Sequence, residues 1–157
     1  MIAPTLAAVA ALVLGFIPAG LTFGLRKNAA QKIGLSVLPV PAWVFIGIWA
    51  IIYPTMGIAV WQIVASGESS TDTTVATIVL AAGFLQSIAF WFTDSLRSTA
   101  VMDATGVLLS VTTAAVLALT TPSAAVWLLP WLVWMPATLG IKLLALRRAN
   151  KQVVRAL

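Results

Sequence analysis

Tryptophan is the residue type most able to do chemistry here, because the 157-residue chain holds seven tryptophans but no histidine and no cysteine. Trp127, Trp131 and Trp134 are spaced by four and three residues, so one helix would carry all three on the same face. These rings lie inside an apolar segment, whereas aromatic anchors of the membrane interface lie at the ends of spans. Their placement therefore favours a cavity lined with indoles.

A second aromatic stripe is formed by Phe45, Trp49 and Tyr53, which recur every fourth residue. Tyr53 is the single tyrosine of the chain, and its hydroxyl would need a partner in mid-membrane. This face is therefore expected to point into a bundle. Taken alone, core packing with Trp43 as an interface anchor explains the segment more simply than a binding site.

Two polar side chains interrupt the apolar segments. Gln86 would be costly in mid-membrane without a hydrogen bond, so it is expected to face other helices or a ligand. Lys142 continues the tryptophan stripe of the last apolar segment, about one turn from its end. We favour snorkelling of Lys142 to the interface over pairing with Asp94 or Asp103, which are expected at the same depth.

Composition excludes most enzyme chemistries. Without cysteine there are no disulfides, thiolate nucleophiles or thiolate-bound metals, and without histidine the commonest metal ligand and general base are missing. The four carboxylates do not cluster in the sequence, so no metal site is predicted. No cofactor is expected to be required.

Hydropathy predicts an integral membrane protein. The chain is 61% hydrophobic and 8% charged, with a mean hydropathy of +1.06, far more apolar than a water-soluble domain requires. Crossing the hydrocarbon core takes about 20 apolar residues. The predicted fold is all-α, with residues 1–157 forming one transmembrane domain of five helices. The expected spans are 4–25, 42–65, 74–92, 99–119 and 124–146.

Loop charges predict the orientation. The first loop, 26–40, and the tail, 147–157, together carry seven Lys and Arg residues, whereas the second and fourth loops carry none. The positive-inside rule then places the N-terminus outside and the C-terminus in the cytoplasm. With no solvated basic domain, nucleic-acid binding is not expected. The first loop is interpreted equally well as a lid over a cavity or as a basic connector that binds anionic lipid head groups.

Small residues recur every fourth position in the first span, at Ala7, Ala11, Gly15 and Ala19. This spacing lets two helix backbones approach closely in lipid. Packing of the first span against its neighbours in the same chain is favoured over a dimer seam.

Residues 41–57, PAWVFIGIWAIIYPTMG, and 130–134, PWLVW, resemble two motifs of the TspO/MBR family of tryptophan-rich sensory proteins, whose mitochondrial member is the translocator protein, or peripheral benzodiazepine receptor. The family patterns are P-x-W-V-F-P-x-x-W-x-x-L-Y-x-x-M-G and P-Y-L-x-W. The resemblance implies a five-helix bundle, commonly dimeric, that binds porphyrins and other hydrophobic ligands in a cavity closed by the first loop. Some bacterial members are reported to promote light-dependent porphyrin breakdown.

The chain departs from the family at several pocket positions. The tryptophan pair before the double proline is replaced by Val37 and Leu38, and the asparagine three residues before Trp91 by Ile88. The tyrosine after the proline of the last span is Trp131, and a later asparagine is Lys142. The resemblance therefore implies a pocket with altered polarity and ligand preference.

The leading hypothesis is a multi-pass protein of a bacterial cell membrane that binds a porphyrin in an aromatic cavity, with a sensory or regulatory role. A metal-free tetrapyrrole suits a chain without histidine or cysteine. Lipid or sterol are further ligand classes, and a homodimer is expected from the family. A light-dependent porphyrin-degrading enzyme, a small transporter and a packing subunit remain alternatives. The residues expected to bind the ligand are Trp43, Phe45, Trp49, Tyr53, Gln86, Trp91, Trp131, Trp134 and Lys142.

Overall fold

The computed structural model describes residues 2–25, 42–67, 71–90, 93 and 95–156. Its regular structure within these ranges is entirely helical, which confirms the predicted all-α class. The expected first loop, 26–40, lies outside the described residues. The helices are α1 (Ile2–Leu25), α3 (Ala42–Ser66), α4 (Thr71–Phe90), α5 (Leu96–Thr120), α6 (Pro122–Trp127) and α7 (Leu129–Ala156).

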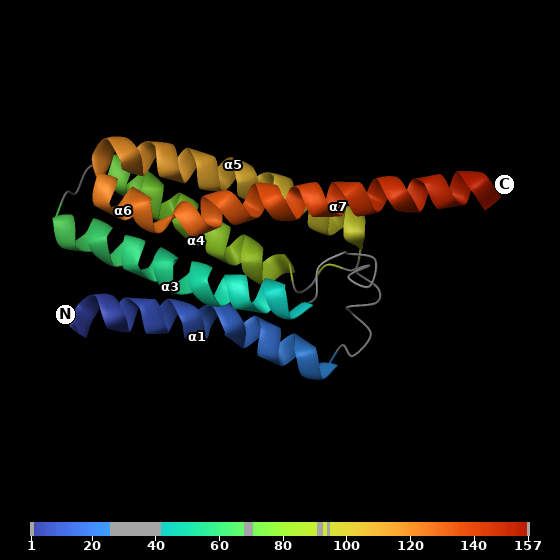
Figure 1. Cartoon of the computed structure of the whole chain (residues 1–157). Helices are drawn as coiled ribbons and strands as arrows, with labels where there is room; N and C mark the ends of the chain where they lie inside the picture. The colour runs from blue at the N-terminus through green and yellow to red at the C-terminus, as the bar shows by residue number, and fades with distance from the viewer. Residues whose placement is uncertain (1, 26–41, 68–70, 91–92, 94, 157) are drawn as a thin grey trace.

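The long helices run up and down beside one another along a common axis (Figure 1). α1 packs mainly on α3, α5 packs on α7 and α4, and the short α6 packs on α3 and α5. The N-terminus lies at the end of the bundle where α3 ends and α6 stands. α7 projects beyond the other helices at the opposite end (Figure 1).

Local sequence signals set several helix ends. Ser95 is extended and its side-chain oxygen accepts a hydrogen bond from the Ser98 N–H at 3.0 Å, which caps the start of α5. Pro122 occupies the first turn of α6, where its missing N–H costs nothing. Gly67 follows α3 with φ of 67°, a left-handed conformation that favours glycine.

The last apolar segment, expected to be one helix over 124–146, is divided into two helices, and this part of the prediction is wrong. α6 ends at Trp127, and Leu128 donates its N–H to the Ala125 carbonyl at 3.1 Å, only three residues back. Pro130 has no N–H to donate to the preceding turn, and its ring disfavours a regular helix just before it. The chain therefore turns slightly at Leu128 before α7 begins.

The seam of small residues on α1 packs against α3 in the same chain. A β-carbon added at Gly57 of α3 would collide with the Ala7 carbonyl oxygen and lie 2.8 Å from the Ala11 β-carbon. Likewise, Gly15 of α1 lies against the ring of Tyr53. Close backbone approach at these positions confirms the preferred interpretation of the seam as intrachain packing.

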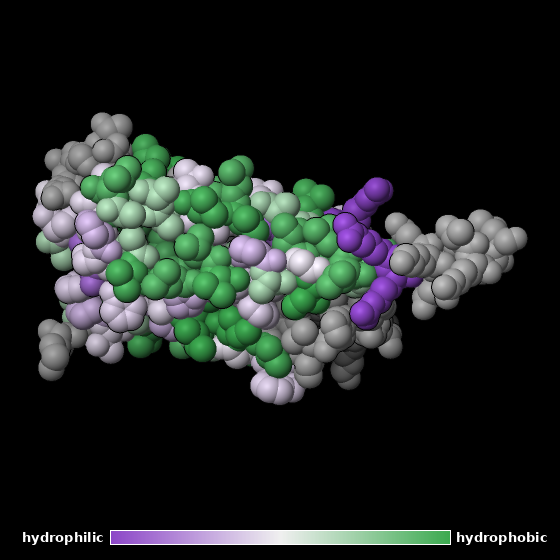
Figure 2. Space-filling model, turned by 45° about the horizontal axis from the view of Figure 1, so that its top comes forward, coloured by the Kyte–Doolittle hydropathy of each residue, from purple (hydrophilic) through white to green (hydrophobic). Residues whose placement is uncertain are grey.

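The outer surface is strongly apolar. Figure 2 shows hydrophobic residues over the middle of the bundle and hydrophilic ones gathered at one end, where Arg147 and Arg148 are exposed. Among the described residues, three helical segments are long and apolar enough to cross a membrane, namely Ile46–Ser66, Leu96–Thr120 and Leu129–Arg148. A shorter apolar stretch is Ala3–Ile17.

Candidate functional site

Tyr53 lies at the centre of an aromatic cluster built from three helices. Its ring centroid is 5.1 Å from that of Trp49 on the same helix, 5.5 Å from Phe16 of α1 and 5.6 Å from Phe84 of α4. The contacts with Phe16 and Phe84 are edge-to-face, a favourable geometry for aromatic pairs. The expected inward orientation of this face of α3 is confirmed, since Tyr53 is buried.

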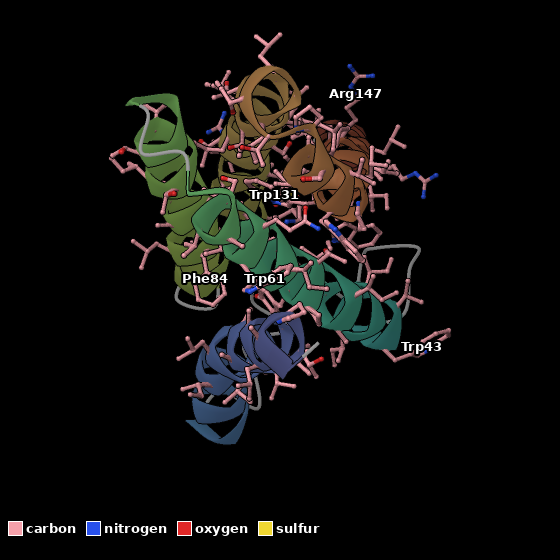
Figure 3. All side chains as sticks on the ribbon, turned by 90° about the vertical axis from the view of Figure 1, so that its left-hand side faces the viewer. Trp43, Trp61, Phe84, Trp131 and Arg147 are labelled. Atoms are coloured by element: carbon pink, nitrogen blue, oxygen red, sulfur yellow. The ribbon has the colours of Figure 1, made fainter. Side chains whose placement is uncertain are left out.

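Trp131 fills the space between α7 and α4. It is only 1% exposed, and Figure 3 shows it among the helices. A β-carbon added at Gly83 of α4 would lie 2.5 Å from the indole of Trp131, so the ring rests directly on the glycine backbone. The absence of a side chain at position 83 is what gives this large ring its place in the interior.

The tryptophans within the described ranges differ in how far they are buried. Trp134 is 8% exposed and lies in the same hydrophobic core as Trp131, and Trp49 packs against that core. Trp127, on the short α6, is 37% exposed, so it does not share the buried face of Trp131 and Trp134 and suits an interface anchor. Trp43 is 72% exposed and points away from the bundle (Figure 3), as an interface anchor would.

Lys142 forms an ion pair with Asp103 across the interface of α5 and α7. The Nζ–Oδ2 distance is 2.7 Å, and the two residues are 2% and 5% exposed. The preferred expectation, snorkelling to the interface, is therefore wrong, and the pairing alternative with Asp103 is correct. Burial of both charges requires such a contact, because an isolated charge in a low-dielectric interior is very costly. Asp94, the other expected partner, lies outside the described residues.

The surroundings of the ion pair continue the tryptophan stripe of α7. Trp134, Thr138 and Lys142 follow at four-residue steps, and all three are buried. The Thr138 hydroxyl donates to the Met135 carbonyl at 3.0 Å and lies within hydrogen-bonding reach of Asp103. One buried face of α7 thus leads from the indoles to a cation.

The buried face of α5 is unusually polar. Its buried residues are Thr99, Ala100, Asp103, Gly106, Ser110, Thr113 and Leu117. Ser110 and Thr113 donate their hydroxyls to carbonyls of their own helix at 2.9 and 2.7 Å, as expected from their positions. Asp103 differs from them because its contact is with another helix. It is therefore the polar residue of this face that links α5 to α7.

Not all of the expected ligand-binding residues can be located. The side chains of Phe45 and Gln86, and the whole of Trp91, lie outside the described part of the structure. Among the others, Tyr53, Trp131, Trp134 and Lys142 are buried. Trp131 and Trp134 share one hydrophobic core against which Trp49 packs, whereas Tyr53 lies among Phe16, Trp49 and Phe84, and Lys142 lies against Asp103. Within the described ranges no cluster of three or more acidic residues has the arrangement of a metal site.

Phe16 and Phe84 are interior aromatic residues that sequence reasoning did not assign to the site. Phe16 lies in a helix whose other aromatic residue is Phe23, seven positions on, and this single pair is too weak a spacing signal to mark either residue. Phe84 directly follows Gly83, and a glycine in an apolar span is a sign of close approach by a neighbouring group. Gly83 thus indicates that another group lies close to α4 at this point, but it does not show that the group is Trp131, and it gives no information on the contact of Phe84 with Tyr53.

The sequence model of the TspO/MBR family matches residues 4–143, nearly the whole chain. No match was found among the curated proteins or among the solved structures. The matched region includes α1 through most of α7, and therefore both aromatic helices and the ion pair. Together with the apolar helices of spanning length, the match identifies an integral membrane protein of a ligand-binding or sensory type. The chain belongs to the TspO/MBR family.

Proposed function

We propose that this protein binds a metal-free porphyrin or a similar flat hydrophobic ligand against the buried aromatic residues of α3, α4 and α7. The observation that carries the proposal is the interior placement of Trp131 and Trp134, with Trp49 packed against the same core. Indole faces stack on flat conjugated rings, and their burial in a membrane protein keeps such a ligand away from water.

The charge on the same face of α7 supports an anionic edge on the ligand. Lys142 lies two turns beyond Trp134, with Thr138 between them. A ring stacked on the indoles would direct a carboxylate arm along α7 toward the ammonium group of Lys142. A porphyrin has this shape, with a flat macrocycle and propionate arms on one edge.

The proposal includes five membrane spans, namely α1, α3, α4, α5 and the α6–α7 pair, with the N-terminus outside and the C-terminus in the cytoplasm. Arg97 at the start of α5 and Arg147 and Arg148 on α7 are exposed at the same end of the bundle. α1 ends and α3 begins at that end as well, and the sequence between these two helices contains Arg26, Lys27 and Lys32. Such an excess of Lys and Arg marks the cytoplasmic side.

Quenching of tryptophan fluorescence by protoporphyrin IX in detergent tests the proposal. Trp131→Leu and Trp49→Leu are expected to raise Kd by about tenfold or more, because each removes a stacking face worth about 1–3 kcal/mol per ring. Trp43→Leu is the matched control, since Trp43 is 72% exposed on the outer surface. It should leave Kd unchanged.

The comparison with the control decides the result. Equal Kd values for all three variants and the wild-type protein would exclude the interior aromatic residues as the binding site. A weaker affinity in the Trp43 variant alone would instead point to binding on the outer surface at the start of α3.

A further inference from the structure

The Asp103–Lys142 pair is a neutral unit that is already complete before any ligand binds. Both side chains are buried, and their charged atoms are 2.7 Å apart. A carboxylate ligand that approaches Lys142 therefore meets a cation whose charge Asp103 has already balanced. If the ligand carboxylate joined this neutral pair without a proton, the buried site would have a net charge of −1. Such a charge is very costly in a low-dielectric interior.

We propose that a carboxylate ligand binds at Lys142 together with one proton, so that the buried site remains neutral. This inference rests on the proposed function, because it assumes that the ligand lies against the aromatic face of α7. It adds that the ligand class is a hydrophobic carboxylic acid whose affinity is coupled to pH through Asp103.

The exchange is balanced in atoms and charge. In the unliganded protein the Asp103 carboxylate forms an ion pair with the Lys142 ammonium. On binding, one proton from solvent enters the site and is held by the two carboxyl groups, the Lys142 ammonium keeps its three protons, and the ligand carboxylate takes a place beside it. No bond is formed or broken except the O–H bond that holds the new proton.

Among the described residues, no second cation lies near the Asp103–Lys142 pair to neutralise the ligand carboxylate. On α7, Arg147 and Arg148 are exposed, and on α5 Arg97 is exposed. α6 has no ionisable side chain, and Asp72 of α4 stands in its first turn, at the end of the bundle away from Asp103. Lys142 is therefore the charged side chain that faces Asp103 from the helices packed on α5.

The position of the pair fits a ligand that lies on the indoles. Trp134, Thr138 and Lys142 form one buried stripe, and eight residues of helix separate Trp134 from Lys142 by about 12 Å. A hydrophobic ring at Trp134 can thus reach the pair with a short anionic arm. Thr138, beside Asp103, provides a further hydroxyl for the proton-bearing carboxyl group.

Calorimetric titration with two porphyrin esters tests the inference on the wild-type protein. Protoporphyrin IX monomethyl ester carries one carboxylate and the dimethyl ester none. Each titration is run at pH 7.5 in two buffers that differ in their ionisation enthalpy, and the difference in heat gives the number of protons taken up. About one proton is expected for the monomethyl ester and none for the dimethyl ester, and Kd of the monomethyl ester should rise about tenfold per pH unit.

Asp103→Asn combined with Lys142→Arg isolates the role of the resident anion. Asparagine keeps the shape of the Asp103 side chain, and arginine keeps its proton when it is buried without a partner, so the ligand carboxylate can pair with this cation directly. Proton uptake should disappear, and at pH 8 the monomethyl ester should bind at least about tenfold more tightly than to wild type. Arg148→Gln, which removes an exposed cation of the same helix, is the control and should retain the uptake of one proton.

The outcomes separate this inference from the proposed function. If both esters bind but the wild-type protein takes up no proton, the coupling is wrong and the aromatic site stands. If proton uptake persists in the Asp103→Asn/Lys142→Arg variant, in which the cation cannot lose its proton, the coupling does not involve this pair. If neither ester binds, the porphyrin site fails and the coupling fails with it.

Discussion

Lys142 is the residue at which burial and charge are in the sharpest conflict. Its ammonium lies inside the bundle at 2% exposure, held by one carboxylate of a neighbouring helix. Removing one partner of a buried ion pair leaves the other charge buried and uncompensated. The resulting loss of folding free energy is larger than the net stability that the intact pair contributes. The ion pair therefore fixes the contact of α5 with α7 without needing to be a large source of stability.

Lys142→Met is expected to lower the free energy of unfolding by about 3–5 kcal/mol, because Asp103 is left buried without its cation. Thermal unfolding in detergent measures the loss. The double variant Asp103→Leu/Lys142→Met should recover most of it, since both charges are then removed. Arg147→Met, which changes an exposed cation on the same helix, should have little effect. A double variant as unstable as the single one would show that the pair contributes through more than charge compensation.

At the residue scale the sequence predicted the interior tryptophans but not all of their neighbours. The four-residue spacing of Trp134, Thr138 and Lys142 placed them on one face of a helix, and the structure confirms this. The sequence could not decide whether Asp94 or Asp103 is the partner of Lys142. Hydropathy places a residue in the membrane only to within about one helical turn, and at that precision both aspartates lie at the depth of Lys142. Pairing depends on the rotation and axial position of α5 against α7, which are tertiary properties.

Among the described residues, the most extensive contact between two helices is that of α1 with α3. Gly57 lies against the Ala7 carbonyl, and Gly15 lies against the Tyr53 ring, so small residues on both helices bring the backbones together. In lipid, where no hydrophobic force drives association between helices, this packing is the main source of stability. The same contact brings Phe16 of α1 to the aromatic cluster.

Gly57→Ala is expected to destabilise the protein by about 1–3 kcal/mol, because the added methyl group meets a backbone oxygen that cannot move freely. The matched control is Gly47→Ala on the same helix, where nothing lies within 4 Å of the new β-carbon. That substitution should be neutral or stabilising by up to about 1 kcal/mol from helix propensity. Unfolding in denaturant compares the two. Equal effects would mean that α1 is not held at Gly57.

The boundaries of α1, α3, α4 and α5 were predictable to within a few residues, because apolar runs in a membrane protein must end near water. α7 instead continues to Ala156, ten residues beyond the expected end of the span at 146 and into the expected tail. α3 covers Ala42–Ser66 against an expected span of 42–65, and α4 starts at Thr71 rather than at residue 74. The turn at Leu128 was missed because Pro130 lies inside a continuous apolar run, where hydropathy shows no interruption. The neighbours of each helix were likewise not encoded in hydropathy, because every span is apolar on most of its surface.

At the scale of the whole molecule, charge is distributed along the axis of the bundle. Exposed Arg97, Arg147 and Arg148 lie at the end from which α7 projects (Figure 1), and the middle of the visible surface is apolar (Figure 2). The buried Asp103–Lys142 pair lies on the side of the bundle near this basic end, since it is less than two turns of α7 from Arg147. A ligand carboxylate at Lys142 would therefore lie nearest to the basic end, which is the cytoplasmic face in the proposed orientation.

Single cysteines test this orientation directly, since the natural chain has none. Ser66→Cys and Ser123→Cys place an exposed thiol at the end of the bundle that holds the N-terminus, and Ser98→Cys places one at the basic end without changing a charge. In intact cells a membrane-impermeant maleimide should label Cys at the first two positions, while position 98 should react only after permeabilisation, because loops rich in Lys and Arg stay in the cytoplasm. The reverse pattern would place Lys142 near the outer face, and equal labelling of positions 66 and 98 would contradict a bundle in which α4, the helix between them, spans the membrane.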